Sequence, residues 1–164
     1  MTTLLWFKRD LRIHDHPALA LAARDEQVVP LYIVEPEYWA LPDTSGRQYA
    51  LLQESLADLQ SALRGLGSDL VVRTGDAVEV FQELYQTVKF DHLVSHEETG
   101  NAWTFARDRA VGTWARAAGI RWTELPQHGV LRRLRDRDGW AARWDRFMQE
   151  PVTPAPRILL PVDG

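Results

Sequence analysis

Short apolar runs and longer amphipathic stretches alternate along the first 125 residues of the chain. Leu4–Phe7 is an apolar run of four residues, short enough for a strand that is buried on both faces of a sheet. Further strands of this kind are predicted over 28–34, 69–74, 92–95 and 121–125. Pro30 lies inside the second run and has no amide donor, so it should lie at the start of the strand or face no partner strand there.

The amphipathic stretches between these runs predict helices. They are expected over 17–24 and 46–66, after Gly75-Asp76, and over 101–118. In the longest of them, Tyr49 and the leucines at 52, 56, 59 and 63 recur at helical spacing. Asp15 and Ser45 precede the first two helices as potential caps, and Pro17 in a first turn loses no hydrogen bond.

This alternation predicts an α/β fold, because strands that alternate with helices imply right-handed crossovers and a parallel sheet. We expect a doubly wound, five-stranded parallel sheet in the order 3-2-1-4-5, arranged as a Rossmann-like three-layer sandwich. Such sheets bind ligands outside the carboxyl ends of their strands, where the order reverses. Lys8, Arg9, Asp10 and Arg12 follow the first strand directly, so they stand at that edge.

Composition narrows the class of protein further. The 164 residues fit one core, and the net charge of −4 gives no sign of a general nucleic-acid binder. The absence of cysteine excludes disulfides, thiolate metal sites and cysteine nucleophiles within these residues. The sequence contains neither a signal peptide nor an apolar stretch of membrane-spanning length. We therefore expect a cytoplasmic, monomeric protein with no membrane contact.

The chain changes character after residue 126, which divides it into three parts. Residues 1–126 form the predicted α/β domain, and 127–150 form a loop and a helix that pack on it, with Trp140, Trp144 and Phe147 on one side of the helix. Four prolines over 151–164 indicate an extended segment typical of an interdomain linker. The arginines at 132, 133, 135 and 137 are interspersed with aspartates, which favours a solvated loop over a DNA-binding patch.

The residues at the end of the first strand carry a recognisable pattern. Residues 6–19, Trp-Phe-Lys-Arg-Asp-Leu-Arg-Ile-His-Asp-His-Pro-Ala-Leu, resemble the N-terminal signature of the DNA photolyase and cryptochrome family, W-F-R-R-D-L-R-x-x-D-N-P-A-L. The chain departs from that signature at Lys8 and His16. The Arg107-Asp108-Arg109-x-Val111 segment also matches, whereas 96–101 departs from the usual N-x-D/E-x-E-P-Y segment.

This resemblance implies an α/β domain that holds a light-harvesting antenna chromophore. In the family, a helical domain follows, binds FAD and, in photolyases, repairs pyrimidine photoproducts in damaged DNA; in cryptochromes the protein signals instead. FAD and DNA contact are thus expected only in a domain beyond Gly164, and no catalytic residue or metal ligand within this chain. The mixed motif resembles the bacterial iron-sulfur branch, which favours ribityllumazine as the antenna, with folate, deazaflavin or FMN as alternatives.

The candidate antenna contacts follow the first, second and fourth strands and begin the long helix. They are Arg9, Val34, Glu35, Trp39, Arg47, Gln48, Leu51, Glu97 and Glu98. A planar chromophore needs apolar faces and a few oriented polar groups, which this set offers. Several have a simpler interpretation. Arg9, with Asp10 and Arg12, could fix a loop by salt bridges, and residues 34–39 could be a plain turn with an aromatic patch. His96-Glu97 is more often part of a solvated loop than a metal or acid-base pair.

Two other classes share this architecture. One is a stand-alone nucleotide-binding module of the universal-stress or electron-transfer-flavoprotein type, and the other is an interaction domain without a ligand. The sequence contains neither G-x-G-x-x-G nor G-x-x-x-x-G-K-[ST], so it lacks the phosphate-binding loops that commonly mark nucleotide sites.

Overall fold

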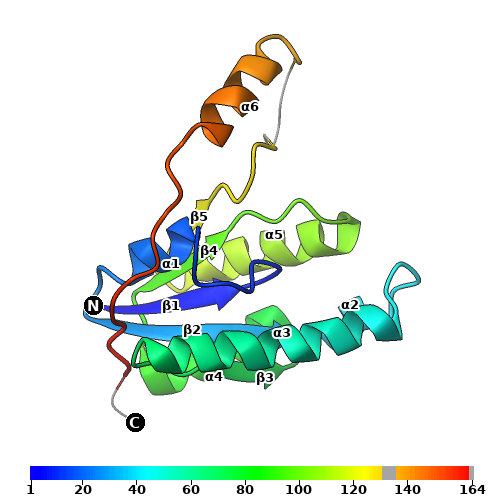
Figure 1. Ribbon diagram of the computed structural model, residues 1–164. Helices are drawn as coiled ribbons and strands as arrows, with labels where there is room; N and C mark the ends of the chain where they lie inside the picture. The colour runs from blue at the N-terminus through cyan, green and yellow to red at the C-terminus, as the bar shows by residue number, and fades with distance from the viewer. Residues whose placement is uncertain (131–135, 163–164) are drawn as a thin grey trace.

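A five-stranded parallel sheet organises the molecule. The computed structural model describes residues 1–130 and 136–162. The strands are β1 (Thr2–Phe7), β2 (Gln27–Val34), β3 (Val71–Thr74), β4 (His92–His96) and β5 (Arg121–Leu125). All neighbouring pairs are parallel and the order is β3-β2-β1-β4-β5, which confirms the predicted topology (Figure 1).

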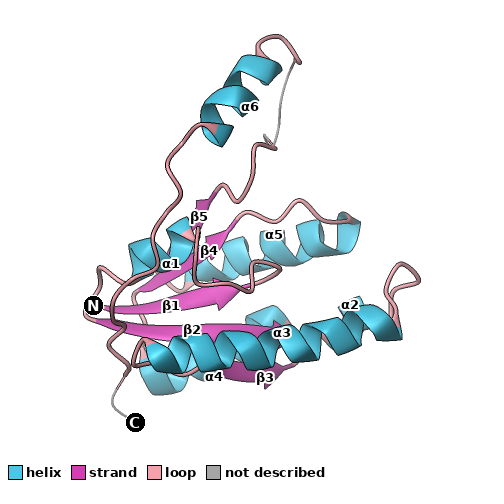
Figure 2. Ribbon diagram, in the orientation of Figure 1, coloured by secondary structure: helices cyan, strands magenta, loops and turns pink. Residues whose placement is uncertain are grey.

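Helices cover both faces of this sheet and make the three layers (Figure 2). The helices of the chain are α1 (Pro17–Ala22), α2 (Pro36–Trp39), α3 (Gly46–Gly65), α4 (Ala77–Val88), α5 (Ala102–Ala117) and α6 (Trp140–Met148), of which α1, α3, α4 and α5 cover the sheet. Leu4 and Trp6 of β1 pack with α4 and α5, whereas Leu5 and Phe7 pack with α1 and α3 on the opposite face. Successive side chains of a strand point to opposite faces, so a strand covered on both sides is a continuous apolar run. Burying such a side chain contributes roughly 2 kcal/mol.

Pro30 costs the sheet no hydrogen bond. The amide of Val28 donates to Leu160 O at 2.8 Å on the β3 side of β2. Pro30 is two residues further along and faces the same side, but β3 pairs with β2 only from Leu31 onward. The proline therefore lies where no partner strand needs its missing amide, as predicted.

The first helix is capped differently from the prediction. His16, not Asp15, is the N-cap of α1, and its Nδ1 accepts a hydrogen bond from the Leu19 amide at 2.9 Å. Asp15 has a positive φ of 49° and forms two hydrogen bonds with Thr153 instead. The Asp15 amide donates to Thr153 O at 2.9 Å, and Asp15 Oδ1 accepts from the Thr153 amide at 3.2 Å. Its carboxylate is thus engaged by the returning C-terminal segment. Pro17 takes the first helical position, as expected.

The C-terminal part departs from the predicted packing. Helix α6 forms within the expected range, but it extends away from the sheet layers, and Trp140 and Trp144 stay 41% exposed (Figure 1). Helices α1, α3, α4 and α5 already cover both faces of the sheet, which leaves α6 no apolar face on it. Arg132, Arg133 and Arg135 of the arginine run lie outside the described residues.

Residues 151–162 are extended, as the prolines predict, but they are tied to the α/β body. The Leu159 side chain is 1% exposed and belongs to the core shared by α1 and α3. Its amide donates to Leu66 O at 2.7 Å. The beginning of the expected linker is therefore part of the core. Among the described helices, none combines the length and apolar character needed to cross a membrane.

Candidate functional site

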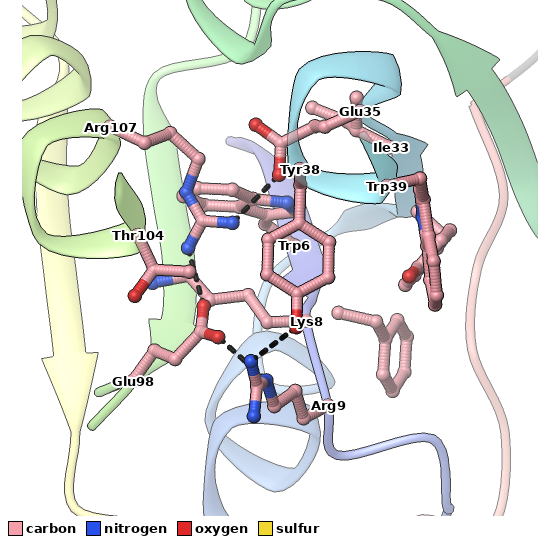
Figure 3. A pocket seen from close by; sticks show the side chains of 12 residues that line it. Trp6, Lys8, Arg9, Ile33, Glu35, Tyr38, Trp39, Glu98, Thr104 and Arg107 are labelled. Carbon is pink, nitrogen blue, oxygen red and sulfur yellow. Dashed lines mark hydrogen bonds and ion pairs between the residues drawn. The ribbon is translucent and has the colours of Figure 1, made fainter. Parts of the chain in front are cut away.

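A small crevice opens at the carboxyl ends of β1, β2 and β4, where the strand order reverses (Figure 3). Its cavity volume is about 40 Å³. The lining residues are Trp6, Phe7, Lys8, Arg9, Tyr32, Ile33, Glu35, Tyr38, Trp39, Glu98, Thr104 and Arg107. The crevice thus has an aromatic and aliphatic inner wall and a charged rim, which is the mixture expected of a small-molecule site.

Arg107 of α5 is the centre of the charged rim. Its Nη1 lies 2.7 Å from Glu35 Oε2, and its Nη2 binds Glu98 Oε2 and lies 2.9 Å from Asp108 Oδ1. The guanidinium also lies 4.7 Å from the Trp6 ring centroid. One turn of α5 therefore brings the ends of β2 and β4 together over the end of β1, and the pairing compensates for the burial of the charges.

Burial controls the protonation of this rim. It raises the pKa of Glu35 to about 7, because desolvation outweighs the opposing effect of Arg107. Burial disfavours the charge of Arg107 as well, but Glu35, Asp108 and Glu98 raise the pKa of the guanidinium above its usual range. Glu35 Oε1 is buried and has no hydrogen-bond partner among the described residues. The site therefore contains one acceptor, or in the protonated form one donor, that the described residues leave unsatisfied.

Arg9 and Tyr38 close the mouth of the crevice. Arg9 Nη2 donates to Tyr38 Oη at 2.6 Å, and Arg9 Nε lies 2.8 Å from Glu98 Oε1 (Figure 3). Tyr38 belongs to α2, a four-residue helix that the sequence analysis did not predict. Arg9 therefore links a short helix after β2 to the loop after β4.

The other charged residues of the first loop hold its shape. Lys8 Nζ lies 3.2 Å from Asp108 Oδ2 and 4.3 Å from the Trp6 ring centroid. Arg12 donates to His14 O at 3.1 Å and to Asp15 O at 2.8 Å. The structural interpretation of this loop thus holds for Arg12, whereas Arg9 lines the crevice.

Asp10 lies in a separate buried cluster with His16 and His96. Asp10 Oδ1 accepts from the Lys8 amide at 2.7 Å, and Oδ2 lies 2.6 Å from His96 Nδ1. His16 Nε2 lies 2.9 Å from the same oxygen, off the ideal hydrogen-bond direction. Burial opposes the charge of Asp10, but contacts with the two histidines hold the pKa of its carboxyl far below the usual range.

The spacing of these three side chains would allow a metal ion, but their hydrogen bonds favour a structural role. His16 Nδ1 accepts from the Leu19 amide, and His96 Nε2 accepts from the Ala18 amide at 3.4 Å. Each ring therefore carries its proton on the nitrogen that faces Asp10, where a metal would need a lone pair. Burial also lowers the pKa of His16, which keeps that ring neutral. The cluster joins the first loop, α1 and β4.

The structure brings together four of the nine candidate residues, Arg9, Glu35, Trp39 and Glu98. Val34 and Glu97 are half-buried beside the crevice and do not line it. Arg47, Gln48 and Leu51 lie on the exposed side of α3, outside the lining. Ligand contact by any of the nine stays a prediction.

Sequence reasoning missed the other eight lining residues, which are Trp6, Phe7, Lys8, Tyr32, Ile33, Tyr38, Thr104 and Arg107. Arg107 was visible only as part of the matching Arg107-Asp108-Arg109 motif, and its position over Trp6 depends on how α5 packs on β1. Tyr38 stands next to a residue that was selected, so the aromatic pair Tyr38-Trp39 was the available signal.

Comparison with known proteins identifies the family. The DNA photolyase family model matches residues 3–139. The chain is 34% identical to a cryptochrome DASH of Natronomonas pharaonis, over 77% of this chain and 29% of that protein. It is 40% identical to the deoxyribodipyrimidine photo-lyase of Escherichia coli, over 58% of this chain and 21% of that protein.

Solved structures agree with this result. A bacterial class III photolyase from Agrobacterium tumefaciens superposes with a TM-score of 0.80 at 25% identity, over 98% of this chain and 35% of that one. A Synechocystis cryptochrome superposes with a TM-score of 0.82 at 22% identity, over 98% of this chain and 37% of that one. The chain thus spans about a fifth to a little over a third of these relatives. It belongs to the DNA photolyase and cryptochrome family.

Proposed function

We propose that this chain is the antenna-chromophore domain of a light-dependent DNA photolyase. The full-length protein would hold FAD in a helical domain, reach damaged DNA through that domain and repair pyrimidine photoproducts. The observation that carries the proposal is the crevice at the reversal point of the sheet, with its aromatic inner wall and a buried, partly unsatisfied carboxylate. We further propose that the protein is cytoplasmic and that this domain is monomeric.

The chemistry of the crevice suits a ribityllumazine. Trp6, Phe7 and Trp39 offer apolar contact for a flat ring, and one Nη1 N–H of Arg107, not used in its bonds to the described carboxylates, could donate to a ring carbonyl. Glu35 Oε1 is an acceptor placed beside the crevice without a partner among the described residues, so it suits a ring N–H or a ribityl hydroxyl. Folate, deazaflavin and FMN present similar groups and are the alternatives.

The chromophore would supply the absorption of light, and the residues of this chain would bind and orient it. Arg107 is held by three carboxylates, so its donors are fixed before a ligand arrives. Trp6 and Phe7 are fully buried strand residues and keep water from the inner wall. A binding site that is rigid on this side loses little entropy when it takes up a ligand.

Chromophore analysis of the full-length protein tests the proposal. The protein is purified, its small molecules are extracted, and their masses are measured. We expect FAD together with a ribityllumazine. Folate, deazaflavin or FMN in its place would reassign the antenna, and FAD alone would refute the antenna function. This chain by itself is expected to retain no FAD and to repair no DNA.

A cryptochrome photoreceptor is the second candidate, because a cryptochrome DASH is among the similar proteins. The two activities differ in the chemistry done on DNA by the full-length protein. Light-dependent loss of photoproducts from irradiated DNA supports the photolyase, and absence of repair by a protein loaded with FAD supports the cryptochrome.

A further inference from the structure

The crevice has a rigid inner wall and a lightly held mouth. Trp6 and Ile33 belong to central strands that are paired on both sides. The mouth is closed by Arg9, whose side chain is 53% exposed, and by the half-buried Tyr38. Helix α2, which carries Tyr38, has no buried residue and no side-chain hydrogen bond at its N-cap. Movement therefore costs least at the mouth.

A chain of polar contacts borders the cavity and runs from Tyr38 through Arg9, Glu98 and Arg107 to Glu35 (Figure 3). The inner part of this chain of contacts is shielded from water, because the side chains of Glu98, Arg107 and Glu35 are 8% exposed or less. The outer contact between Arg9 and Tyr38 faces water, where such a contact contributes at most about 1 kcal/mol. The weakest of these polar contacts is thus the one between Arg9 and Tyr38.

The neighbours of Tyr38 limit what has to move. Trp39 packs edge-on against Tyr49 of α3, with ring centroids 5.0 Å apart, so the end of α2 is anchored. Tyr38 itself lies 5.6 Å from the Trp103 ring, on the outer side of α5. Opening the mouth would therefore need the Arg9 and Tyr38 side chains to move, while Trp39 keeps its contact with α3.

We propose that Arg9 and Tyr38 form a gate that sets how fast a planar heteroaromatic ligand enters and leaves the crevice. The proposal rests on the proposed antenna function and concerns access to that same site. The cavity of about 40 Å³ is partly open to solvent and is too small for a bicyclic ring while Arg9 contacts Tyr38. Entry therefore requires Arg9 to leave Tyr38.

Ligand loading tests the gate. Full-length protein stripped of its chromophore is mixed with ribityllumazine, and binding and release are followed by fluorescence. Losing the outer contact in Tyr38→Phe should make both rates about fivefold faster. Arg64→Gln is the matched control, because Arg64 forms an exposed pair with Asp69 away from the crevice. Rates for Tyr38→Phe within twofold of those of the unmodified protein would overturn the gate.

A second measurement separates the gate from the antenna assignment. In this chain, Arg9 Nε lies 2.8 Å from Glu98 Oε1, and its N–H gives an NMR signal whose exchange with water reports opening. The exchange should be several-fold faster in Tyr38→Phe and unchanged in Arg64→Gln. If the full-length protein binds no ribityllumazine while exchange accelerates, the antenna assignment fails and the gate stands. Unchanged exchange in Tyr38→Phe refutes the gate whatever ligand is bound.

Discussion

Two buried charged clusters lie at the end of β1, and they differ in what their unsatisfied atom faces. In the Asp10 cluster, His16 Nε2 makes no hydrogen bond but lies against Asp10 Oδ2 at 2.9 Å, and the other ring nitrogens of His16 and His96 have partners within 3.4 Å. In the Arg107 cluster, Glu35 Oε1 has no partner among the described residues, and a cavity lies beside it. The first cluster joins three elements, whereas the second lines an opening.

This difference distinguishes the structural Asp10 cluster from the candidate binding site around Arg107 more clearly than charge or burial does. Each cluster has members in the matching motifs, Asp10 in the first and Arg107 in the second, and each shifts the pKa of a carboxyl, Asp10 downward and Glu35 upward. Contacts with partners explain the first shift and desolvation explains the second. A buried polar atom without a partner next to a cavity is therefore the more informative feature.

The largest expected effect comes from breaking the paired cluster. Asp10→Ala would leave the amide of Lys8 and the N–H groups of His16 and His96 without their acceptor. Buried groups that lose a charged partner cost about 3–5 kcal/mol in total, so the free energy of unfolding should fall by that amount. Urea denaturation of the chain measures it. A loss below about 1 kcal/mol would show that the cluster is not the scaffold it is taken for.

The second prediction uses the pH dependence of Glu35. Its pKa is about 7 in the folded chain and near the ordinary 4.5 when unfolded, so the folded chain holds the proton more tightly. Its contribution to stability is fully present below about pH 4.5 and is lost as the pH rises to about 7, by up to about 3 kcal/mol.

Glu35→Gln removes this titration, so the difference in unfolding free energy between the variant and the unmodified chain should change across that interval. Urea denaturation at about pH 5 and about pH 7.5 measures it. Parallel profiles for the two proteins would contradict the raised pKa. Glu79→Gln is a suitable control, since Glu79 is exposed in the first turn of α4.

The smallest effect is expected for His16→Asn, which restores the residue common in the family. An asparagine oxygen can accept the Leu19 amide at the N-cap, so stability should change by less than about 1 kcal/mol. His16→Ala removes the cap and should cost about 1–2 kcal/mol. Thermal unfolding of the two variants compares them directly. Equal losses in both would show that capping is not the role of His16.

The sheet could be predicted from sequence because its signals are local. Apolar runs of the length of Leu4–Phe7 and their alternation with helices indicate a parallel, doubly wound sheet, for which 3-2-1-4-5 is a common order, and caps such as Ser45 mark helix starts. The cap of α1 could not be predicted this way. Asp15 is engaged by Thr153, a contact between residues 138 positions apart.

The site was only partly predictable, for a geometric reason. Switch-point reasoning located the strand ends and so selected Arg9, Glu35 and Glu98. Arg47 was chosen because it follows the second strand closely in sequence, but α2 and the turn after it intervene and carry the start of α3 away from the crevice. Arg107 comes from a helix whose placement over Trp6 is a packing result.

The returning segment around Leu159 has a consequence for where the domain can be cut. Leu159 is buried in the core between α1 and α3, so a chain ended at residue 126 or 150 would lack this side chain and would expose the core residues that pack against it. The stretch that carries α6 leaves the body after Leu125 and rejoins it where Thr153 meets Asp15. It thus connects two fixed points of the body, and because the entropy of closing a loop grows slowly with its length, a change in its length should affect the stability of the layers little.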